Sequence, residues 1–282
     1  MVHQVVISCT NLTGRGAPRC ALMWRAALAL ALCAASVPAW PEEAQPLTVD
    51  VPVTAAVTAG GFALWGAGEL AKGELTPPSC RWCEPPALDR HARAVVLWSD
   101  PSAAGLLSDV LLVALPASLA AADYLFASRD LRTASEDVLV SMEAISLAAA
   151  ATAVAKPAVA RRRPAAWAAG VRTSPDDDRA FFSGHVATAF AAAGAFGTVA
   201  HLRGYPEWRA VYAVGFGVAT TIGYLRMAAD EHWLTDVAAA AAVGTALGIG
   251  VPLLFHQGKQ EETWTVTPWP GVTAGLRLRM TF

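Results

Sequence analysis

The segment from Arg226 to Asp236 brings a guanidinium, an imidazole and a carboxylate together between two apolar runs. His232 and Asp236 stand four residues apart, which on a helix places both side chains on one face. A carboxylate there can hold one ring nitrogen of the histidine and leave the other free to attack. Arg226 offers a planar cation suited to a phosphate or a carboxylate. Alone, this spacing is a weak signal, and its weight depends on partners elsewhere in the chain.

A basic cluster from Lys156 to Arg163 follows the apolar run Val138–Ala155. Pro157 and Pro164 disfavour a continuous helix through it, so we expect these basic side chains at a membrane interface. The alternative interpretation is that arginines beside a span only set membrane topology.

A third motif, Ser183-Gly184-His185, opens another apolar run after a polar segment. Serine is a favoured helix N-cap, and glycine lets the backbone approach a ligand closely. The free N–H groups and the positive dipole end of such a helix can bind an anion. A simple cap with a packed histidine is the alternative.

The three motifs together suggest one site for a phosphate-type anion. Lys156, Arg163 and Arg226 would supply cations, Ser183 and Gly184 would supply neutral donors, and two histidines remain for proton transfer and covalent chemistry. All three motifs lie at the same ends of their predicted helices. In an antiparallel bundle those ends share one face.

The composition indicates how these motifs are positioned. Of the 282 residues, 55% are apolar and only 16% are charged, whereas soluble domains carry about 25% charged residues. The formal net charge of −2 gives no basic surface for nucleic acid. We therefore predict an all-α fold, a multi-span helical membrane bundle of five to six helices. A soluble all-α protein is the alternative, because Asp109, Asp123 and Glu143 interrupt apolar runs.

The chain divides into three predicted parts. Residues 1–39 resemble a signal peptide or signal anchor, residues 40–256 form the helical membrane domain, and residues 257–282 alternate in polarity like a short β-hairpin. The predicted spans are Val51–Leu70, Ala103–Phe126, Val138–Ala155, Phe181–Ala200, Ala210–Leu225 and Val237–Phe255.

Cys80 and Cys83 form a C-x-x-C pair in a polar segment. A zinc site needs four ligands, and a redox motif would need a thioredoxin-like context, so neither is favoured. A short-range disulfide in an oxidising compartment fits better. We expect no metal site and no cofactor.

The motifs K-x6-R-P, S-G-H and R-x5-H-x3-D, in this order over residues 156–236, resemble the phosphatidic acid phosphatase type 2 superfamily, also called lipid phosphate phosphatases. Vanadium-dependent haloperoxidases are relatives with the same site. Phe182 stands where proline often precedes S-G-H. Leu225 replaces a frequent serine, which weakens one phosphate contact.

The resemblance implies a role for each residue. His232 is the nucleophile that forms a phosphohistidine, and Asp236 orients it. His185 protonates the leaving alkoxide and then activates water. The residues that bind the phosphoryl oxygens are Lys156, Arg163, Ser183, Gly184 and Arg226.

The implied function is hydrolysis of a lipid phosphate monoester or pyrophosphate, with the lipid phosphate and membrane lipids as partners. The alternatives are a lipid phosphotransferase with the same intermediate, a vanadium-dependent haloperoxidase, and a membrane protein without activity. The sequence selects neither a headgroup nor an oligomeric state.

The sequence gives two conflicting indications about the membrane side of the site. A cleaved leader followed by six spans would place the site in the cytoplasm, whereas a disulfide at Cys80 and Cys83 would place it outside. We expect that Val51–Leu70, which contains four glycines, does not fully span. The site then faces the periplasm at a bacterial-type inner membrane.

Overall fold

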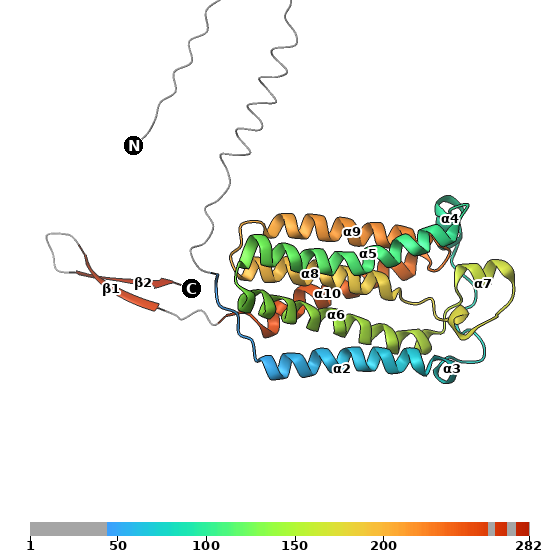
Figure 1. Cartoon of the computed structure of the whole chain (residues 1–282), viewed down its shortest axis with the longest axis horizontal. Coiled ribbons are helices and arrows are strands. Elements are labelled where there is room, and N and C mark those ends of the chain that lie inside the picture. The colour runs from blue at the N-terminus through green and yellow to red at the C-terminus, as the bar shows by residue number, and fades with distance from the viewer. Residues whose placement is uncertain (1–43, 259–262, 270–274, 282) are drawn as a thin grey trace, which may run out of the picture. The chain divides into compact units, whose positions relative to one another are not determined.

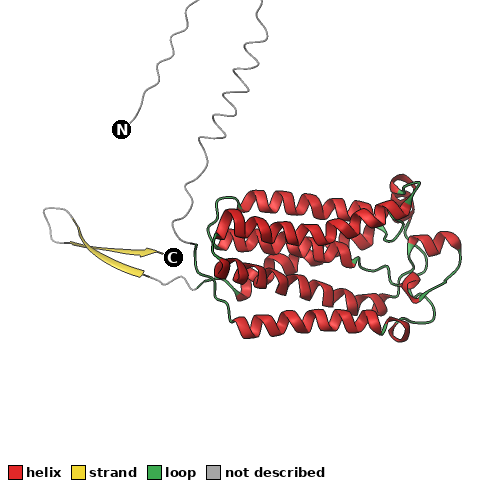
Figure 2. Cartoon of the chain, in the orientation of Figure 1, coloured by secondary structure: helices red, strands yellow, loops and turns green. Residues whose placement is uncertain are grey.

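The structure is a computed structural model that describes residues 44–258, 263–269 and 275–281. The leader predicted over residues 1–39 lies outside the described residues. Six long helices run side by side and alternate in direction (Figures 1 and 2). They are α2 (Val51–Leu70), α5 (Pro101–Ala122), α6 (Leu131–Val159), α8 (Gly184–Leu202), α9 (Trp208–Ala228) and α10 (Leu234–Phe255).

Shorter elements connect them. Most lie at the end of the bundle where α2 finishes and α8 begins (Figure 1). They are α3 (Lys72–Leu75), α4 (Ala87–Val96), α7 (Pro164–Ala169) and the 3-10 turn η2 (Pro175–Asp178), while the π-helical turn η1 (Asp123–Ser128) extends α5 at the opposite end. After the bundle, β1 (Thr263–Trp269) and β2 (Gly275–Thr281) pair antiparallel, with Thr263 opposite Thr281.

Five helical segments among the described residues are long and apolar enough to cross a membrane. They are α2, Pro101–Ser128, α6, α8 and α10. The sixth long helix, α9, has 21 residues but is not among them. The prediction of an all-α membrane bundle of five to six helices is confirmed.

The glycines of α2 do not interrupt it. The helix is continuous over 20 residues and is one of the five candidate spans, so the structure does not support the expectation that this run stops short. Two of its glycines face α6 instead. A Cβ at Gly68 would lie 3.0 Å from the Cβ of Ala153, and a Cβ at Gly61 would lie 2.6 Å from the Ser146 hydroxyl. Small residues there allow the two helices to approach closely.

Helix α8 is the central helix and packs against α5, α6, α9 and α10. Its alanines, including Ala187 and Ala191, are fully buried. The partner surface on α10 carries Gly244 and Gly248, each directly against backbone atoms of α8. This close contact fixes the position of the first turn of α8.

The end of α6 separates the two parts of the basic cluster. Asp130 caps α6 by accepting a 2.9 Å hydrogen bond from the Thr133 backbone N–H, so the helix begins earlier than its apolar run. It continues past Pro157 and ends at Val159, and the capping residue Ala160 has a left-handed φ of 45°. Pro164 then begins α7. No single helix runs through the whole cluster, as expected, but Pro157 lies inside α6 and does not interrupt it.

The polar segment between α2 and α5 folds over the end of the bundle. Cys80 and Cys83 form a disulfide there. The backbone of Trp82 pairs with that of Arg161 in an isolated parallel bridge. This segment also contains α4, which we did not predict from the sequence.

Candidate functional site

A cavity of about 740 Å³ opens at the end of the bundle that carries the motifs. Six of the eight predicted site residues line it: Lys156, Arg163, Gly184, His185, Arg226 and His232. Ser183 and Asp236 lie behind this lining and are fully buried. The structure therefore brings the three sequence motifs to one place, as their helix ends predict.

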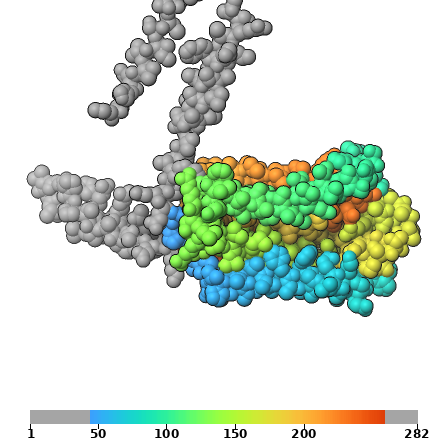
Figure 3. Space-filling view, in the orientation of Figure 1, coloured from blue at the N-terminus to red at the C-terminus, as the bar shows by residue number. Residues whose placement is uncertain are grey.

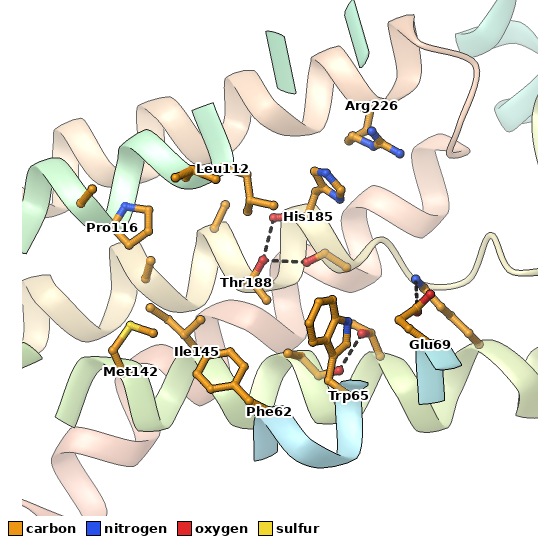
Figure 4. Close-up of a pocket in the computed structure, with 18 of the residues that line it drawn as sticks. Phe62, Trp65, Glu69, Leu112, Pro116, Met142, Ile145, His185, Thr188 and Arg226 are labelled. Atoms are coloured by element: carbon orange, nitrogen blue, oxygen red, sulfur yellow. Dashed lines mark hydrogen bonds and ion pairs between the residues drawn. The ribbon is translucent and has the colours of Figure 1, made fainter. Parts of the chain in front are cut away.

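Each motif enters the cavity from a different element. Lys156 lies in the last turn of α6, His185 in the first turn of α8 and Arg226 in the last turn of α9. Arg163 precedes α7, and His232 lies in the loop before α10. Figure 4 shows His185 and Arg226 close together at the polar end of the cavity.

The His232 ring is held by a backbone carbonyl. Its Nδ1 lies 2.8 Å from the oxygen of Ala180, and only 3% of the residue is exposed. Because a carbonyl can only accept, Nδ1 carries the proton and Nε2 keeps its lone pair. Burial, followed by the charges of Arg226 and Arg163, holds the pKa of His232 well below its ordinary value. The ring is therefore neutral, as a nucleophile must be.

Asp236 contacts other partners than the one expected from the sequence. Its Oδ2 lies 3.8 Å from His232 Nδ1, which is too far for a hydrogen bond. That oxygen instead accepts from the backbone N–H of Trp233 at 2.8 Å and so caps α10. The other oxygen accepts a short hydrogen bond from Arg161. In this structure Asp236 fixes the helix behind His232, while Ala180 fixes the ring.

Arg161 is a positioning residue that the sequence did not reveal. It is 1% exposed and bridges two buried carboxylates, Asp236 and Asp89, with the latter at 2.5 Å. Its guanidinium also lies 3.6 Å from the ring centre of Trp82. The motif spacing selects Arg163 from three successive arginines, and nothing in the sequence connects Asp89 of α4 to this cluster.

Carboxylates balance the cations around the cavity. Glu69 lies 3.5 Å from the Lys156 amine. Glu231 pairs closely with Arg163 and lies 3.4 Å from Arg226. We did not predict these acidic partners, and each leaves its cation within reach of the cavity.

Several polar atoms of the predicted site have no hydrogen-bond partner within the described part of the chain. They are the buried Ser183 hydroxyl and the Nε atoms of Arg163 and Arg226. Ser183 occupies the N-cap position of α8, but its side chain makes no capping bond. Buried donors of this kind normally have partners. The two arginines line the cavity, whereas the Ser183 hydroxyl lies behind that lining.

The rest of the cavity is apolar. Its walls are Phe62 and Trp65 from α2, Leu112 and Pro116 from α5, and Met142 and Ile145 from α6 (Figure 4). In the space-filling view, α2 lies along the lower edge of the bundle and α5 lies above it (Figure 3). The cavity thus joins a cationic end to a hydrocarbon-lined part. Among the described residues, no group of three or more histidine, cysteine or acidic side chains is arranged to hold a metal ion.

Comparisons with known proteins agree with this arrangement. The family model for the PAP2 superfamily matches residues 137–260, which include all eight predicted site residues. The resemblance to this superfamily that the motifs predict is therefore confirmed over this part of the chain. No curated protein matches the chain.

One similar solved structure is the crystal structure of the first transmembrane PAP2 type phosphatidylglycerolphosphate phosphatase from Bacillus subtilis. It is 16% identical, and the similarity covers 70% of this chain and 93% of that chain with a TM-score of 0.44.

Proposed function

We propose that this protein is a membrane-bound phosphatase that hydrolyses a lipid phosphate monoester or pyrophosphate through a phosphohistidine. The observation that supports this most strongly is the single cavity that joins Lys156, Arg163 and Arg226 to apolar walls between α2 and α5. Such a cavity fits a phosphate attached to a hydrocarbon chain. The match of residues 137–260 to the PAP2 superfamily supports the same class of reaction.

In the proposed first step, His232 Nε2 attacks phosphorus, and the bond from phosphorus to the leaving oxygen breaks. His185 gives its proton to that oxygen. In the second step, water attacks the phosphohistidine, His185 takes a proton from the water, and the P–N bond breaks. The surrounding cations stabilise the charge on the equatorial oxygens in both transition states.

The decisive measurement is release of inorganic phosphate from a panel of lipid phosphates by the purified protein. His232→Ala should abolish turnover, because no nucleophile remains. His91→Ala is the matched control, since His91 is an exposed histidine of α4 and should leave activity intact. Substantial turnover by His232→Ala would exclude a phosphohistidine at this position. Adding an alcohol acceptor to the assay separates hydrolysis from phosphotransfer by the product formed.

Activity should also survive a chelator such as EDTA. Lys156, Arg163 and Arg226 line the cavity, and their charges can neutralise the phosphoryl oxygens without a divalent cation. The control is the same assay with added magnesium. Complete loss of turnover in EDTA that magnesium restores would contradict the proposed mechanism.

A further inference from the structure

An acidic side chain outside the family match contacts the second histidine of the site. Asp109 lies in α5, and its Oδ1 is 2.7 Å from His185 Nε2. The same oxygen is 3.6 Å from Arg226 Nη1, and the adjacent Ser108 hydroxyl accepts a 3.2 Å hydrogen bond from that nitrogen. Consecutive residues of α5 therefore contact two of the predicted site residues, although α5 precedes the matched region.

A charged side chain at the position of Asp109 costs free energy in a membrane. The segment Pro101–Ser128 is one of the candidate spans, and a carboxylate in such a segment normally has a partner or a function. The Asp109 side chain is 61% exposed, so burial does not force the contact with His185.

The charges around His185 show why this carboxylate matters. Lys156 from α6 and Arg226 from α9 face it with positive charge, and His232 faces it from the loop before α10. Burial and these positively charged neighbours oppose a positive charge on the ring, whereas Asp109 favours it. A general acid must hold a proton before the leaving oxygen arrives.

We infer that Asp109 is a positioning residue that holds the Nε2 proton of His185 in place for the leaving oxygen. This inference rests on the proposed function. Before substrate binds, Nε2–H donates to Asp109 Oδ1. As the P–O bond breaks, that proton passes to the leaving oxygen. When water attacks the phosphohistidine, Nε2 takes one proton from the water, and the restored N–H again donates a hydrogen bond to Asp109 Oδ1.

The test compares the pH profile of kcat for the wild-type protein and Asp109→Asn. Asparagine keeps a neutral acceptor and removes the charge, so kcat should fall about tenfold while KM changes by less than about twofold. A general acid works only when protonated, and removal of the negative partner favours ring deprotonation. The basic limb of the profile should therefore move about one unit to lower pH. Asp109→Glu keeps the charge and should return the basic limb of the kcat profile to its wild-type pH.

Asp123→Asn is the matched control, since Asp123 follows α5 at the opposite end of the same span. Melting temperatures with and without inorganic phosphate establish that each variant is folded, and Asp109→Ser replaces the asparagine variant if that one is not. An unchanged kcat profile in a folded, uncharged variant would overturn the inference. So would a higher kcat with a lower KM, because Asp109 would then compete with substrate for Arg226. A wild-type protein inactive on the whole lipid panel would instead refute the proposed function.

Discussion

The His232 imidazole is almost fully buried beside two guanidinium groups, and this surrounding decides its protonation state. A single acceptor, the Ala180 carbonyl, leaves Nδ1 as the protonated nitrogen. The neutral state is thus a property of the folded chain. In the unfolded chain, the same ring titrates near pH 6.5.

This difference predicts a pH dependence of stability. Because the pKa of His232 is lowered on folding, the unfolded chain binds a proton below about pH 6.5 that the folded protein excludes. Stability is therefore greatest above that pH and is lost as the pH falls toward the folded-state pKa. Between about pH 7.5 and pH 5.5, the melting temperature of the wild-type protein should fall more than that of His232→Gln. Equal falls in the two proteins would contradict this prediction.

At the residue scale, the sequence identified the site side chains of the three motifs but not the residues that hold them in place. Lys156, Arg163 and Arg226 could be found because their spacing repeats a known pattern. Arg161 and Asp89 could not, since they are 72 residues apart and meet only in the folded chain. The sequence shows Asp109 only as an interruption of an apolar run, and its partner becomes visible in the structure.

Among the helices, the contact between α8 and α10 depends on glycine. A Cβ at Gly248 would lie 2.5 Å from the Ala191 carbonyl oxygen, which is backbone and cannot move aside cheaply. Gly248→Ala should therefore destabilise the protein by about 1–3 kcal/mol, seen as a lower melting temperature in detergent. Gly250→Ala is the control, because no heavy atom of the described neighbours lies within 4 Å of its added Cβ. If both variants melt like the wild-type protein, the two helices are not packed as described.

The apolar part of the cavity predicts a limit on lipid length. Ala120 of α5 lines the cavity about three helical turns after Asp109, which contacts the cationic end, so a phenylalanine there should obstruct a long chain but spare a short one. We expect Ala120→Phe to raise KM for long-chain lipid phosphates by roughly tenfold and to leave short-chain KM nearly unchanged. Val110→Phe is the control, because Val110 is an exposed residue of α5 outside the cavity lining. Equal effects on both chain lengths would place the lipid chain elsewhere.

At the element scale, hydrophobic runs predicted the six long helices because apolar length is a local property. The predicted ends of the helices were less accurate, because a capping residue such as Asp130 starts a helix before its apolar residues begin. Helix α4 was not predicted, although its ten residues are strongly amphipathic at helical spacing. The sequence could not show what holds this helix in place, which includes the paired hydrogen bonds of 2.6 and 2.7 Å from Arg93 to the distant Asp230.

For the whole molecule, we propose that the site end of the bundle faces the periplasm. The Cys80–Cys83 disulfide lies in the segment that folds over this end, and disulfides persist in oxidising compartments. An alkaline phosphatase reporter joined within residues 76–86 should be active. The same reporter joined between α8 and α9, near Gly204, should be inactive because that loop lies at the other end of the bundle (Figure 1). The reverse pattern would place the site in the cytoplasm.

The bridge from Trp82 and Asp89 to Arg161 has a consequence for where this protein can be divided. The region shared with the superfamily begins at residue 137, yet the support behind His232 comes partly from residues before it. A fragment limited to the shared region would leave Arg161 without Asp89 or its aromatic cover, and the cavity without its α2 and α5 walls. The region shared with the superfamily and the smallest part of the chain that can form the complete site therefore have different boundaries.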